Sequence, residues 1–170
     1  MKAIILTASD SGYQGKRDDT SGPLLCKMME EAGYEIVRQI LLPDDQEMLA
    51  QQMIHICDNK EADILLTTGG TGFSMRDCMP EATTQVVERL VPGISEAMRY
   101  YSLQITKRAM LSRAVAGIRK QTLIINLPGS PKAVEENLSF ILPELWHGLE
   151  ILKGSANECA RKGNGEESCN

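Results

Sequence analysis

The chain has 170 residues, of which 42% are hydrophobic and 24% charged, as is typical of one soluble globular domain. Its formal net charge of −5 argues against binding to nucleic acid or to anionic membranes, because both need a basic surface. No apolar stretch is long enough to span a bilayer. The apolar N-terminal run ends at Ser9 and Asp10, too early for a signal peptide, so we expect a cytoplasmic protein.

The first half of the chain alternates between apolar runs and amphipathic segments. We expect a strand over Lys2–Ala8, a polar loop over Ser9–Asp19, a helix from Ser21 to Gly33 and a strand over Glu35–Leu42. Pro23 suits the first turn of this helix and Gly33 its C-terminal cap. The predicted apolar face of the helix consists of Leu24, Met28 and Ala32.

A second helix should follow Pro43, which ends the second strand. Asp44 is the predicted N-cap, and Glu47 three residues later approximates a capping box. Helical spacing then places four apolar side chains on one face: Leu49, Met53, Ile56 and Cys57.

The second half begins with a strand predicted over Asp63–Thr67 and a helix from about Pro80 to Leu90. Pro92 and Gly93 break this helix, and another follows with Ile94, Met98 and Tyr101 on one face. Two strands are expected over Arg113–Gly117 and Gln121–Leu127. A last helix begins near Pro131, with Pro143 predicted to kink or split it, and apolar residues keep helical spacing along it: Val134, Leu138, Ile141, Leu145 and Leu149. We expect one domain over residues 1–152 and a disordered polar tail over 153–170.

Alternating strands and helices predict an α/β fold with a mostly parallel sheet covered on both faces. Ligands of such sheets bind beyond the carboxyl ends of the strands. Ser9-Asp10, Asp44, the loop 69–72 and the turn at Pro128-Gly129 each follow a predicted strand. We therefore expect these segments to lie together at one edge of the sheet.

Three glycines in four positions follow the third predicted strand, in the run Thr67-Thr68-Gly69-Gly70-Thr71-Gly72. This loop, residues 69–72, matches neither the dinucleotide-binding nor the Walker glycine pattern. Its backbone N–H groups could form an anion-binding nest, with the Thr68 and Thr71 hydroxyls adding hydrogen bonds. The alternative is a simple turn.

Three aspartates accompany these loops. Asp77 suits Mg²⁺, which prefers one or two carboxylates together with ligand phosphates, but it could instead cap the following helix. Asp44 has the same two interpretations. Asp10 also follows a predicted strand. A shared metal–nucleotide site therefore explains the positions of all three aspartates better than three unrelated helix caps do. The five cysteines and two histidines show no zinc-site spacing, and Cys78 has no neighbouring histidine to activate it.

Other groups could contact phosphates or could be purely structural. Ser21 is either the N-cap of the first long helix or a ligand contact beside Gly22. Lys132, after Ser130, could meet a phosphate or be solvated. A local basic cluster in the second half either faces the ligand or offsets the acidic surface: Arg108, Arg113, Arg119 and Lys120.

Taken together, these motifs resemble the molybdenum-cofactor biosynthesis proteins that bind molybdopterin, and most closely the stand-alone adenylyltransferases among them. The resemblance covers roughly residues 2–152. The motifs that carry it, in chain order, are Ser9-Asp10, Asp19-Thr20-Ser21-Gly22, Pro43-Asp44-Asp45, Thr67 to Gly72, Arg76-Asp77, Pro80-Glu81-Ala82-Thr83, Leu111-Ser112-Arg113 and Leu127-Pro128-Gly129-Ser130-Pro131-Lys132-Ala133.

This resemblance implies a three-layer α/β fold, usually assembled as a trimer. The implied reaction requires Mg²⁺, transfers AMP from ATP to the terminal phosphate of molybdopterin and releases pyrophosphate. The resemblance also implies that a downstream molybdenum-insertion protein receives the adenylylated product. Asp44 and Asp77 match the family's required acids and are assigned to catalysis and to the metal. The residues implied in substrate binding are Ser9, Asp10, Ser21, Gly22, Thr68, Gly69, Gly70, Thr71, Gly72, Glu81, Ser112, Pro128, Gly129, Ser130 and Lys132.

One departure from the family pattern is Cys78-Met79, where relatives commonly carry an aliphatic residue and a threonine. Asp45 beside Asp44 leaves open which carboxylate acts, and the pattern does not distinguish molybdenum from tungsten pathways. Two alternative functions remain: a non-catalytic molybdopterin-binding or scaffolding trimer, and a different nucleotide-processing enzyme of related fold.

Overall fold

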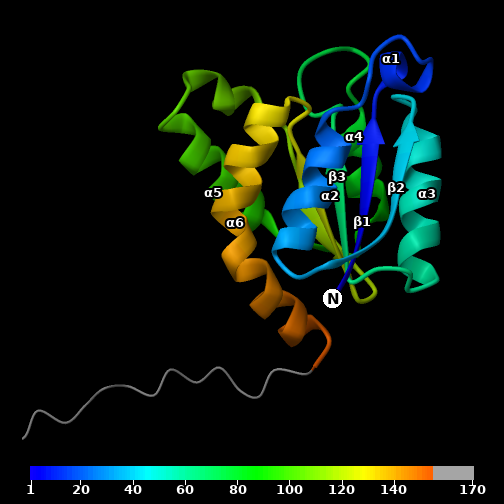
Figure 1. The fold of residues 1–170 in the computed structure, drawn as a ribbon, viewed down its shortest axis with the longest axis vertical. Helices are drawn as coiled ribbons and strands as arrows, with labels where there is room; N and C mark the ends of the chain where they lie inside the picture. Colours follow the sequence, from blue (N-terminus) through cyan, green and yellow to red (C-terminus); the bar gives the residue numbers. More distant parts are fainter. Residues whose placement is uncertain (155–170) are drawn as a thin grey trace, which may run out of the picture.

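The computed structural model describes residues 1–154, in which strands and helices largely alternate along the chain (Figure 1). The first half contains β1 (Lys2–Ala8), α1 (Asp10–Tyr13), α2 (Ser21–Glu31), β2 (Glu35–Leu42), α3 (Gln46–Asp58) and β3 (Ile64–Thr68). The second half contains α4 (Met79–Val86), β4 (Arg89–Leu90), α5 (Pro92–Leu103), the 3-10 helix η1 (Lys107–Leu111), β5 (Ala116–Arg119), β6 (Thr122–Leu127) and α6 (Pro131–Leu152). Of the predicted tail 153–170, residues 155–170 lie outside the described part.

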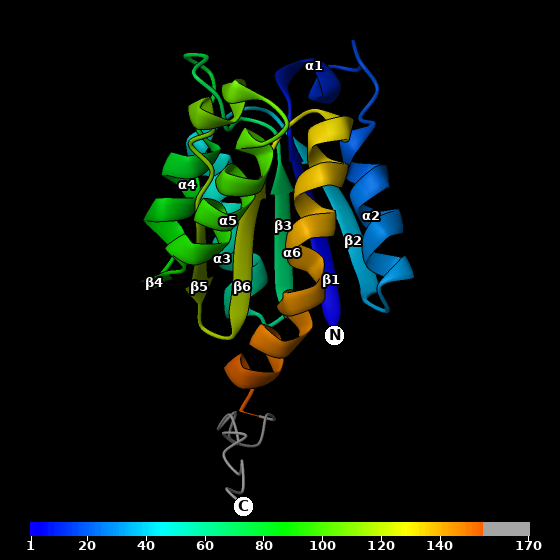
Figure 2. The same ribbon diagram turned by 90° about the vertical axis from the view of Figure 1, so that its left-hand side faces the viewer.

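The strands form one six-stranded sheet in the order β2-β1-β3-β6-β5-β4. The pairs β2–β1, β1–β3 and β3–β6 are parallel, whereas β5 and β4 continue the sheet antiparallel. Helices α2, α5 and α6 cover one face and α3 and α4 the other, which makes three layers (Figures 1 and 2). The predicted three-layer fold with a mostly parallel sheet is therefore confirmed.

Two hydrophobic cores lie on opposite faces of this sheet because successive strand residues point to opposite sides. Ile5 and Leu66 pack with α2 and α6, while Ile4 and Leu65 pack with α3 and α4. All four side chains are fully buried. Each contributes about 1.5–3 kcal/mol by leaving water, so the central strands are held firmly beneath the loops at their ends.

The N-terminal third contains two corrections to the predicted elements. The loop predicted over Ser9–Asp19 contains the short helix α1, because the Ser9 hydroxyl accepts a hydrogen bond from the N–H of Gly12 (3.1 Å). The fully buried apolar residues of α2 are Leu25 and Met29, whereas Leu24 and Met28 of the predicted face are only partly buried against the same core and Ala32 is exposed. Both stripes are apolar in the sequence, so helical spacing alone cannot choose between them.

The predicted cap of α3 was also wrong. Asp45, and not Asp44, occupies the N-cap position, and its Oδ1 accepts a hydrogen bond from the N–H of Met48 (2.9 Å). The apolar stripe predicted for α3 is fully buried, as expected. Asp44 is consequently free of helix capping.

The segment between β3 and α5 differs from its prediction. The strand begins and ends one residue later than predicted, and α4 ends at Val86 instead of continuing to Leu90. Val87 has extended backbone angles, and the N–H of Glu88 donates to the carbonyl of Ile118. Residues 89–90 therefore form the edge strand β4 beside β5, where Leu90 is exposed.

The antiparallel strand β5 begins three residues later and ends two residues later than the predicted strand Arg113–Gly117. Residue 113 is instead drawn toward the glycine loop, since its N–H donates to the carbonyl of Thr71 (3.0 Å). The β5–β6 turn is made at Lys120, which has a positive φ of 52°. This shift brings the Ser112–Arg113 segment to the carboxyl edge of the sheet.

Helix α6 is continuous from Pro131 to Leu152, so of the predicted kink or split at Pro143 the split was wrong. Pro143 removes one backbone N–H on the exposed side of the helix. Burial of the five predicted apolar residues on the opposite side keeps the helix in register with the sheet.

Candidate active site

Four loops meet at the carboxyl edge of the sheet, the upper edge in Figure 1. In the strand register Ala8 pairs with Leu42, Thr7 with Thr68, and Thr68 with Leu127. The segments that follow these strands are 9–10, 43–45, 69–72 and 128–130. The predicted convergence of these loops is therefore confirmed.

The glycine loop is locked tightly against its neighbours. Gly69 and Gly70 have φ angles of 91° and 62°, a region that favours glycine. A Cβ on Gly69 would overlap the carbonyl oxygen of Ala8. The Thr68 hydroxyl donates to the carbonyl of Pro128 (2.6 Å), so it fixes the loop to the 128–130 turn, and its contact with a ligand stays a prediction.

Asp44 lies against the glycine loop. Its Oδ2 accepts a hydrogen bond from the N–H of Asp10 (2.9 Å), and its own N–H donates to Oδ1 of Asp10 (3.1 Å). A Cβ on Gly70 would lie 3.1 Å from Oδ1 of Asp44. Burial raises the pKa of Asp44, the hydrogen bond from Asp10 opposes this, and the nearby carboxylates of Asp10 and Asp77 raise it further.

Asp77 approaches the other end of the loop. Its Oδ2 accepts a hydrogen bond from the N–H of Ser74 (3.0 Å) and lies 2.9 Å from where a Cβ on Gly72 would stand. Cys78, and not Asp77, occupies the N-cap position of α4, with no capping hydrogen bond from its side chain. The alternative interpretation of Asp77 as a helix cap is therefore wrong.

Arg113 holds this part of the site in place. Its guanidinium donates to the carbonyls of Gly72 (2.6 Å) and Asp77 (2.8 Å) and forms an ion pair with Glu81. Three segments distant in sequence are thereby joined by one side chain. Arg113 was predicted as a member of a basic cluster and not as a site residue, although its position in the Leu111-Ser112-Arg113 motif indicated a role at the site.

A buried amide supports the Arg113 segment from below. Asn126 is fully buried in β6, and its Oδ1 accepts a hydrogen bond from the N–H of Val115 (3.1 Å). Its Nδ2 donates to the hydroxyls of Thr67 (2.9 Å) and Thr83 (2.8 Å). These bonds connect β3, α4 and the 113–115 segment, and no pattern in the sequence had indicated them.

Arg76 is a second residue that the sequence analysis did not assign to the site. Its Nε and Nη2 donate to the two carboxylate oxygens of Asp10, at 2.9 and 3.1 Å. This hydrogen-bonded guanidinium lowers the pKa of Asp10. Because Asp10 is neutralised by Arg76, Asp44 and Asp77 are the predicted acids left to face a cation.

Those two carboxylates fit a magnesium ion that also takes phosphate oxygens, since Mg²⁺ commonly binds through one or two carboxylates. They flank opposite ends of a loop whose glycines leave the space in front of them clear. Within residues 1–154, no three His, Cys, Asp or Glu side chains are grouped as a metal site. A cation here would therefore depend on ligand oxygens for its remaining contacts.

A polar cavity of about 310 Å³ lies on the β1 side of the glycine loop. The residues that line it include Ser9, Asp18, Ser21, Gly69, Gly129 and Ser130. The Ser9 hydroxyl caps α1 and the Ser130 hydroxyl caps α6. We call this the polar cavity.

The first backbone N–H groups of α2, beside the polar cavity, already have hydrogen-bond acceptors. Oδ1 of Asp19 accepts hydrogen bonds from the N–H groups of Ser21 (3.1 Å) and Gly22 (2.9 Å). The Ser21 hydroxyl donates to the carbonyl of Gly129 (2.8 Å), so it is not the N-cap. Ser21 and Gly22 therefore shape the wall of the cavity, and their direct contact with a ligand stays a prediction.

Lys132, which was predicted either to meet a phosphate or to be solvated, is exposed and pairs with Glu136 one helical turn along α6 (3.8 Å).

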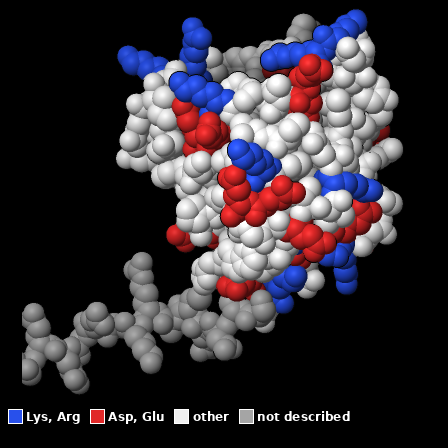
Figure 3. All heavy atoms as spheres, viewed as in Figure 1, with Lys and Arg blue, Asp and Glu red and all other residues white. Residues whose placement is uncertain are grey.

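The predicted basic cluster of Arg108, Arg113, Arg119 and Lys120 is dispersed. Arg119 and Lys120 pair with Asp58 and Glu88 at the opposite end of the sheet. Figure 3 shows basic and acidic side chains interspersed on the face that carries α2 and α6.

Cys78 and Met79 do not contribute reactive groups. Burial raises the pKa of the Cys78 thiol, with the Asp44 carboxylate adding to the shift, which works against a thiolate. Met79 is fully buried in the core beneath α4. Its position indicates packing and not contact with a ligand.

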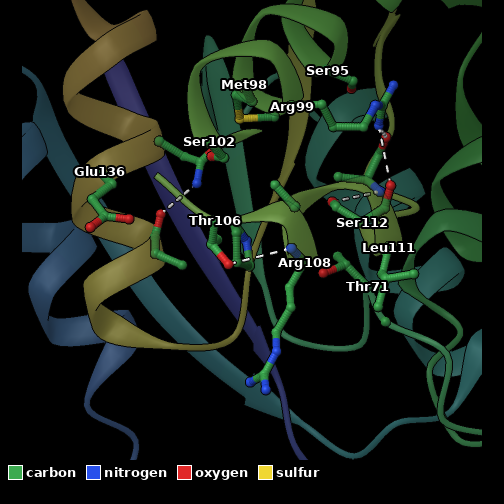
Figure 4. Close-up of a pocket in the computed structure, with 16 residues that line it drawn as sticks. Thr71, Ser95, Met98, Arg99, Ser102, Thr106, Arg108, Leu111, Ser112 and Glu136 are labelled. Atoms are coloured by element: carbon green, nitrogen blue, oxygen red, sulfur yellow. Dashed lines mark hydrogen bonds between the residues drawn. The ribbon is translucent and has the colours of Figure 1, made fainter. Parts of the chain in front are cut away.

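A second cavity, of about 280 Å³, lies on the other side of the glycine loop, between α5, η1 and α6 (Figure 4). Thr71, Gly72, Ser112 and Pro128, all predicted as binding residues, line it. Arg108 also lines it. Because most of the exposed lining is apolar, we call this the apolar cavity.

Comparisons with known proteins agree with this arrangement. The family described as "Probable molybdopterin binding domain" matches residues 4–147. The molybdopterin adenylyltransferase of Helicobacter pylori strain J99 is 37% identical over 158 residues, which cover 89% of this chain and 87% of that protein. The molybdopterin adenylyltransferase of Escherichia coli K12 is 39% identical over 137 residues, covering 79% and 70%. The crystal structure of the molybdopterin biosynthesis enzyme MoaB from Thermus thermophilus has a TM-score of 0.85 and 42% identity, covering 90% and 96%.

Proposed function

The chain belongs to the family of molybdopterin-binding domains, and from this premise we propose that it is a molybdopterin adenylyltransferase. It would transfer AMP from ATP to the terminal phosphate of molybdopterin and release pyrophosphate. We assign this activity to residues 1–152. We further propose that the protein assembles as a homotrimer and passes its product to a molybdenum-insertion protein, since the family resemblance implies both. We also propose that it acts in the cytoplasm, where ATP is abundant.

One observation carries the proposal at the level of the site. Asp44 and Asp77 approach the two ends of the glycine loop, at the sheet edge where parallel α/β folds bind ligands. A phosphate held at the loop would lie between them. We propose that these two carboxylates hold Mg²⁺, which supplies charge neutralisation to the phosphates of ATP when bound.

This reaction mainly requires the protein to position the reacting groups of the two substrates. A phosphate oxygen of molybdopterin attacks the α-phosphorus of ATP, a new P–O bond forms, and the bond to the leaving pyrophosphate breaks. Backbone N–H groups of the glycine loop would bind phosphate oxygens. Arg113 keeps Gly72 and Asp77 in fixed positions, so the reacting groups are held at a short and constant separation.

Purified protein incubated with ATP, Mg²⁺ and molybdopterin tests the proposal through pyrophosphate release. Wild type should turn over, Asp77→Ala should not, and Glu96→Ala should retain activity as a control, because Glu96 is an exposed acid on α5 that lines neither cavity. Absence of wild-type turnover, or full activity of Asp77→Ala, contradicts the assignment. Molybdopterin binding without pyrophosphate release would instead favour the scaffolding alternative.

A further inference from the structure

Residues 73–76, which follow the glycine loop, form an exposed segment that we call the strap. All four residues are exposed, and the strap lies at the upper edge of the sheet (Figure 1). Within residues 1–154, the ion pair between Arg76 and Asp10 is the only hydrogen-bonded contact that the strap makes outside residues 73–77. The position of the strap therefore depends on this one pair.

The strap holds the carboxylate of Asp77. The N–H of Ser74 donates to Oδ2 of Asp77 (3.0 Å), and the N–H of Asp77 donates to the carbonyl of Ser74 (3.0 Å). Arg113 binds Asp77 only at its backbone carbonyl (2.8 Å), which leaves the carboxylate free to turn. The direction of this carboxylate is consequently set by the strap.

Asp10 connects the strap to the other proposed metal ligand, Asp44. Two hydrogen bonds, one in each direction, join the backbone N–H of each of these residues to the carboxylate of the other. The Arg76 guanidinium binds both carboxylate oxygens of Asp10, a two-point contact that fixes direction as well as distance. Asp44 follows β2 and Asp77 follows β3, so the strap joins two acids that come from different strands.

The strength of the Arg76–Asp10 pair limits what it can do. Its side chains are 63% and 34% exposed, and exposed pairs of this kind bias an equilibrium by roughly 2- to 5-fold. The chain contains a matched pair at the opposite end of the sheet, where Arg119 donates to both carboxylate oxygens of Asp58 (2.9 and 2.8 Å). Only the Arg76 pair leads, through hydrogen bonds, to both Asp44 and Asp77.

We propose, on the basis of the proposed function, that Arg76 is a positioning residue for the two metal-binding acids. By holding the strap on Asp10, it sets the separation of the Asp44 and Asp77 carboxylates in advance of metal binding. Arg76 does not act on the reacting groups themselves. Its loss raises the Mg²⁺ concentration that the reaction requires more than it lowers kcat, because at saturating Mg²⁺ the carboxylates close on the bound ion.

Two charge-neutral double variants test this role. Arg76→Met with Asp10→Asn removes both charges of the strap pair without changing the net charge, and Asn keeps an Oδ1 that can accept the Asp44 N–H. Arg119→Met with Asp58→Asn makes the same change at the opposite end of the sheet. The strap variant should need about 2- to 5-fold more Mg²⁺ than wild type for half-maximal pyrophosphate release, with a smaller change in kcat at saturating Mg²⁺. The control variant should have the Mg²⁺ requirement of wild type.

Titration with Mn²⁺ alone, followed by electron paramagnetic resonance, measures the arrangement of the acids without turnover. The Kd for Mn²⁺ should be about 2- to 5-fold higher in the strap variant than in wild type, and unchanged in the control variant. Because both variants keep the net charge of wild type, a change in Kd reports the position of the carboxylates and not the overall charge.

Limited digestion with trypsin measures the attachment of the strap itself. Trypsin cleaves after Arg76 only when the guanidinium leaves Asp10 and enters the acidic specificity pocket of the protease. Asp10→Asn keeps the cleavage site and should be cut after Arg76 about 2- to 5-fold faster than wild type, whereas Asp58→Asn should be cut there at the wild-type rate.

An unchanged Kd for Mn²⁺ in the strap variant, or an equal rise in the control variant, overturns the inference. So does an unchanged rate of cleavage after Arg76 in Asp10→Asn. A loss of kcat that exceeds the shift in Mg²⁺ requirement also contradicts it, since Arg76 would then act on the reacting groups. Wild type that releases no pyrophosphate refutes the adenylyltransferase, while the Mn²⁺ and trypsin results still decide the role of Arg76.

Discussion

Replacing Gly69 with alanine should destabilise the protein more than the same replacement at Gly15. Both glycines have positive φ angles, 91° and 68°, where alanine is strained by about 1–2 kcal/mol. Their surroundings differ. A Cβ at Gly15 would have no heavy atom within 4 Å, whereas a Cβ at Gly69 would overlap the carbonyl oxygen of Ala8 at the end of β1.

The overlap sets the expected difference between the two variants. Relieving it requires a shift of the loop or of β1, and overpacking of this kind costs about 1–3 kcal/mol. The total is then about 2–5 kcal/mol for Gly69→Ala, against about 1–2 kcal/mol for Gly15→Ala. For a domain of this size the difference lowers the Tm by a further 2–12 °C, roughly.

Urea unfolding followed by circular dichroism at 25 °C measures both free energies, and ATP titration reports whether the loop still binds nucleotide. Gly69→Ala should also raise the Kd for ATP, since its loop no longer packs on Ala8. Equal destabilisation of the two variants would refute the close packing of the loop on β1. A wild-type Kd in a destabilised Gly69→Ala would refute the role of the loop in binding.

Three further predictions concern charged residues. Asp45→Ala should lose about 1 kcal/mol of stability, because Asp45 caps α3, but keep wild-type pyrophosphate release. Asp44→Asn should abolish turnover yet raise the free energy of unfolding at pH 7, because burial raises the pKa of Asp44 and thus disfavours its ionised form in the fold. This gain should shrink as the pH falls through the raised pKa toward the ordinary aspartate value, and a series of urea titrations that shows no gain at pH 7 would contradict it. Arg113→Met should lower both the Tm and the affinity for ATP, having lost charged hydrogen bonds worth about 1.5–3 kcal/mol each. Arg119→Met, which removes an ion pair at the opposite end of the sheet, should lower the Tm only; equal effects on ATP affinity would refute the local role of Arg113.

Much of the fold could be predicted from the sequence because its central strands are continuous apolar runs. The bounds of β1 and β2 were predicted to the residue, and the convergence of the loops followed from strand order alone. Edge strand β4 escaped prediction because two residues are too short for any periodicity. Its pairing with β5 depends on backbone contacts with a segment far along the chain.

The site was predictable in its motifs but not in its contacts. Adjacent Asp44 and Asp45 are chemically equivalent in the sequence, and only the backbone path at the start of α3 decides which one caps it. The pairing of Arg76 with Asp10 joins residues 66 positions apart, so the spacing of residues within either motif does not indicate it.

Transfer of the α-phosphate tests the proposed adenylyltransferase activity most directly. Wild-type protein is incubated with Mg²⁺, molybdopterin and ATP labelled at its α-phosphorus, and the products are separated by chromatography. We predict that the label moves into a pterin-containing product in step with pyrophosphate release, and that Asp77→Ala forms none of it. Label recovered only as ATP or free AMP, or equal transfer by Asp77→Ala, would contradict the account.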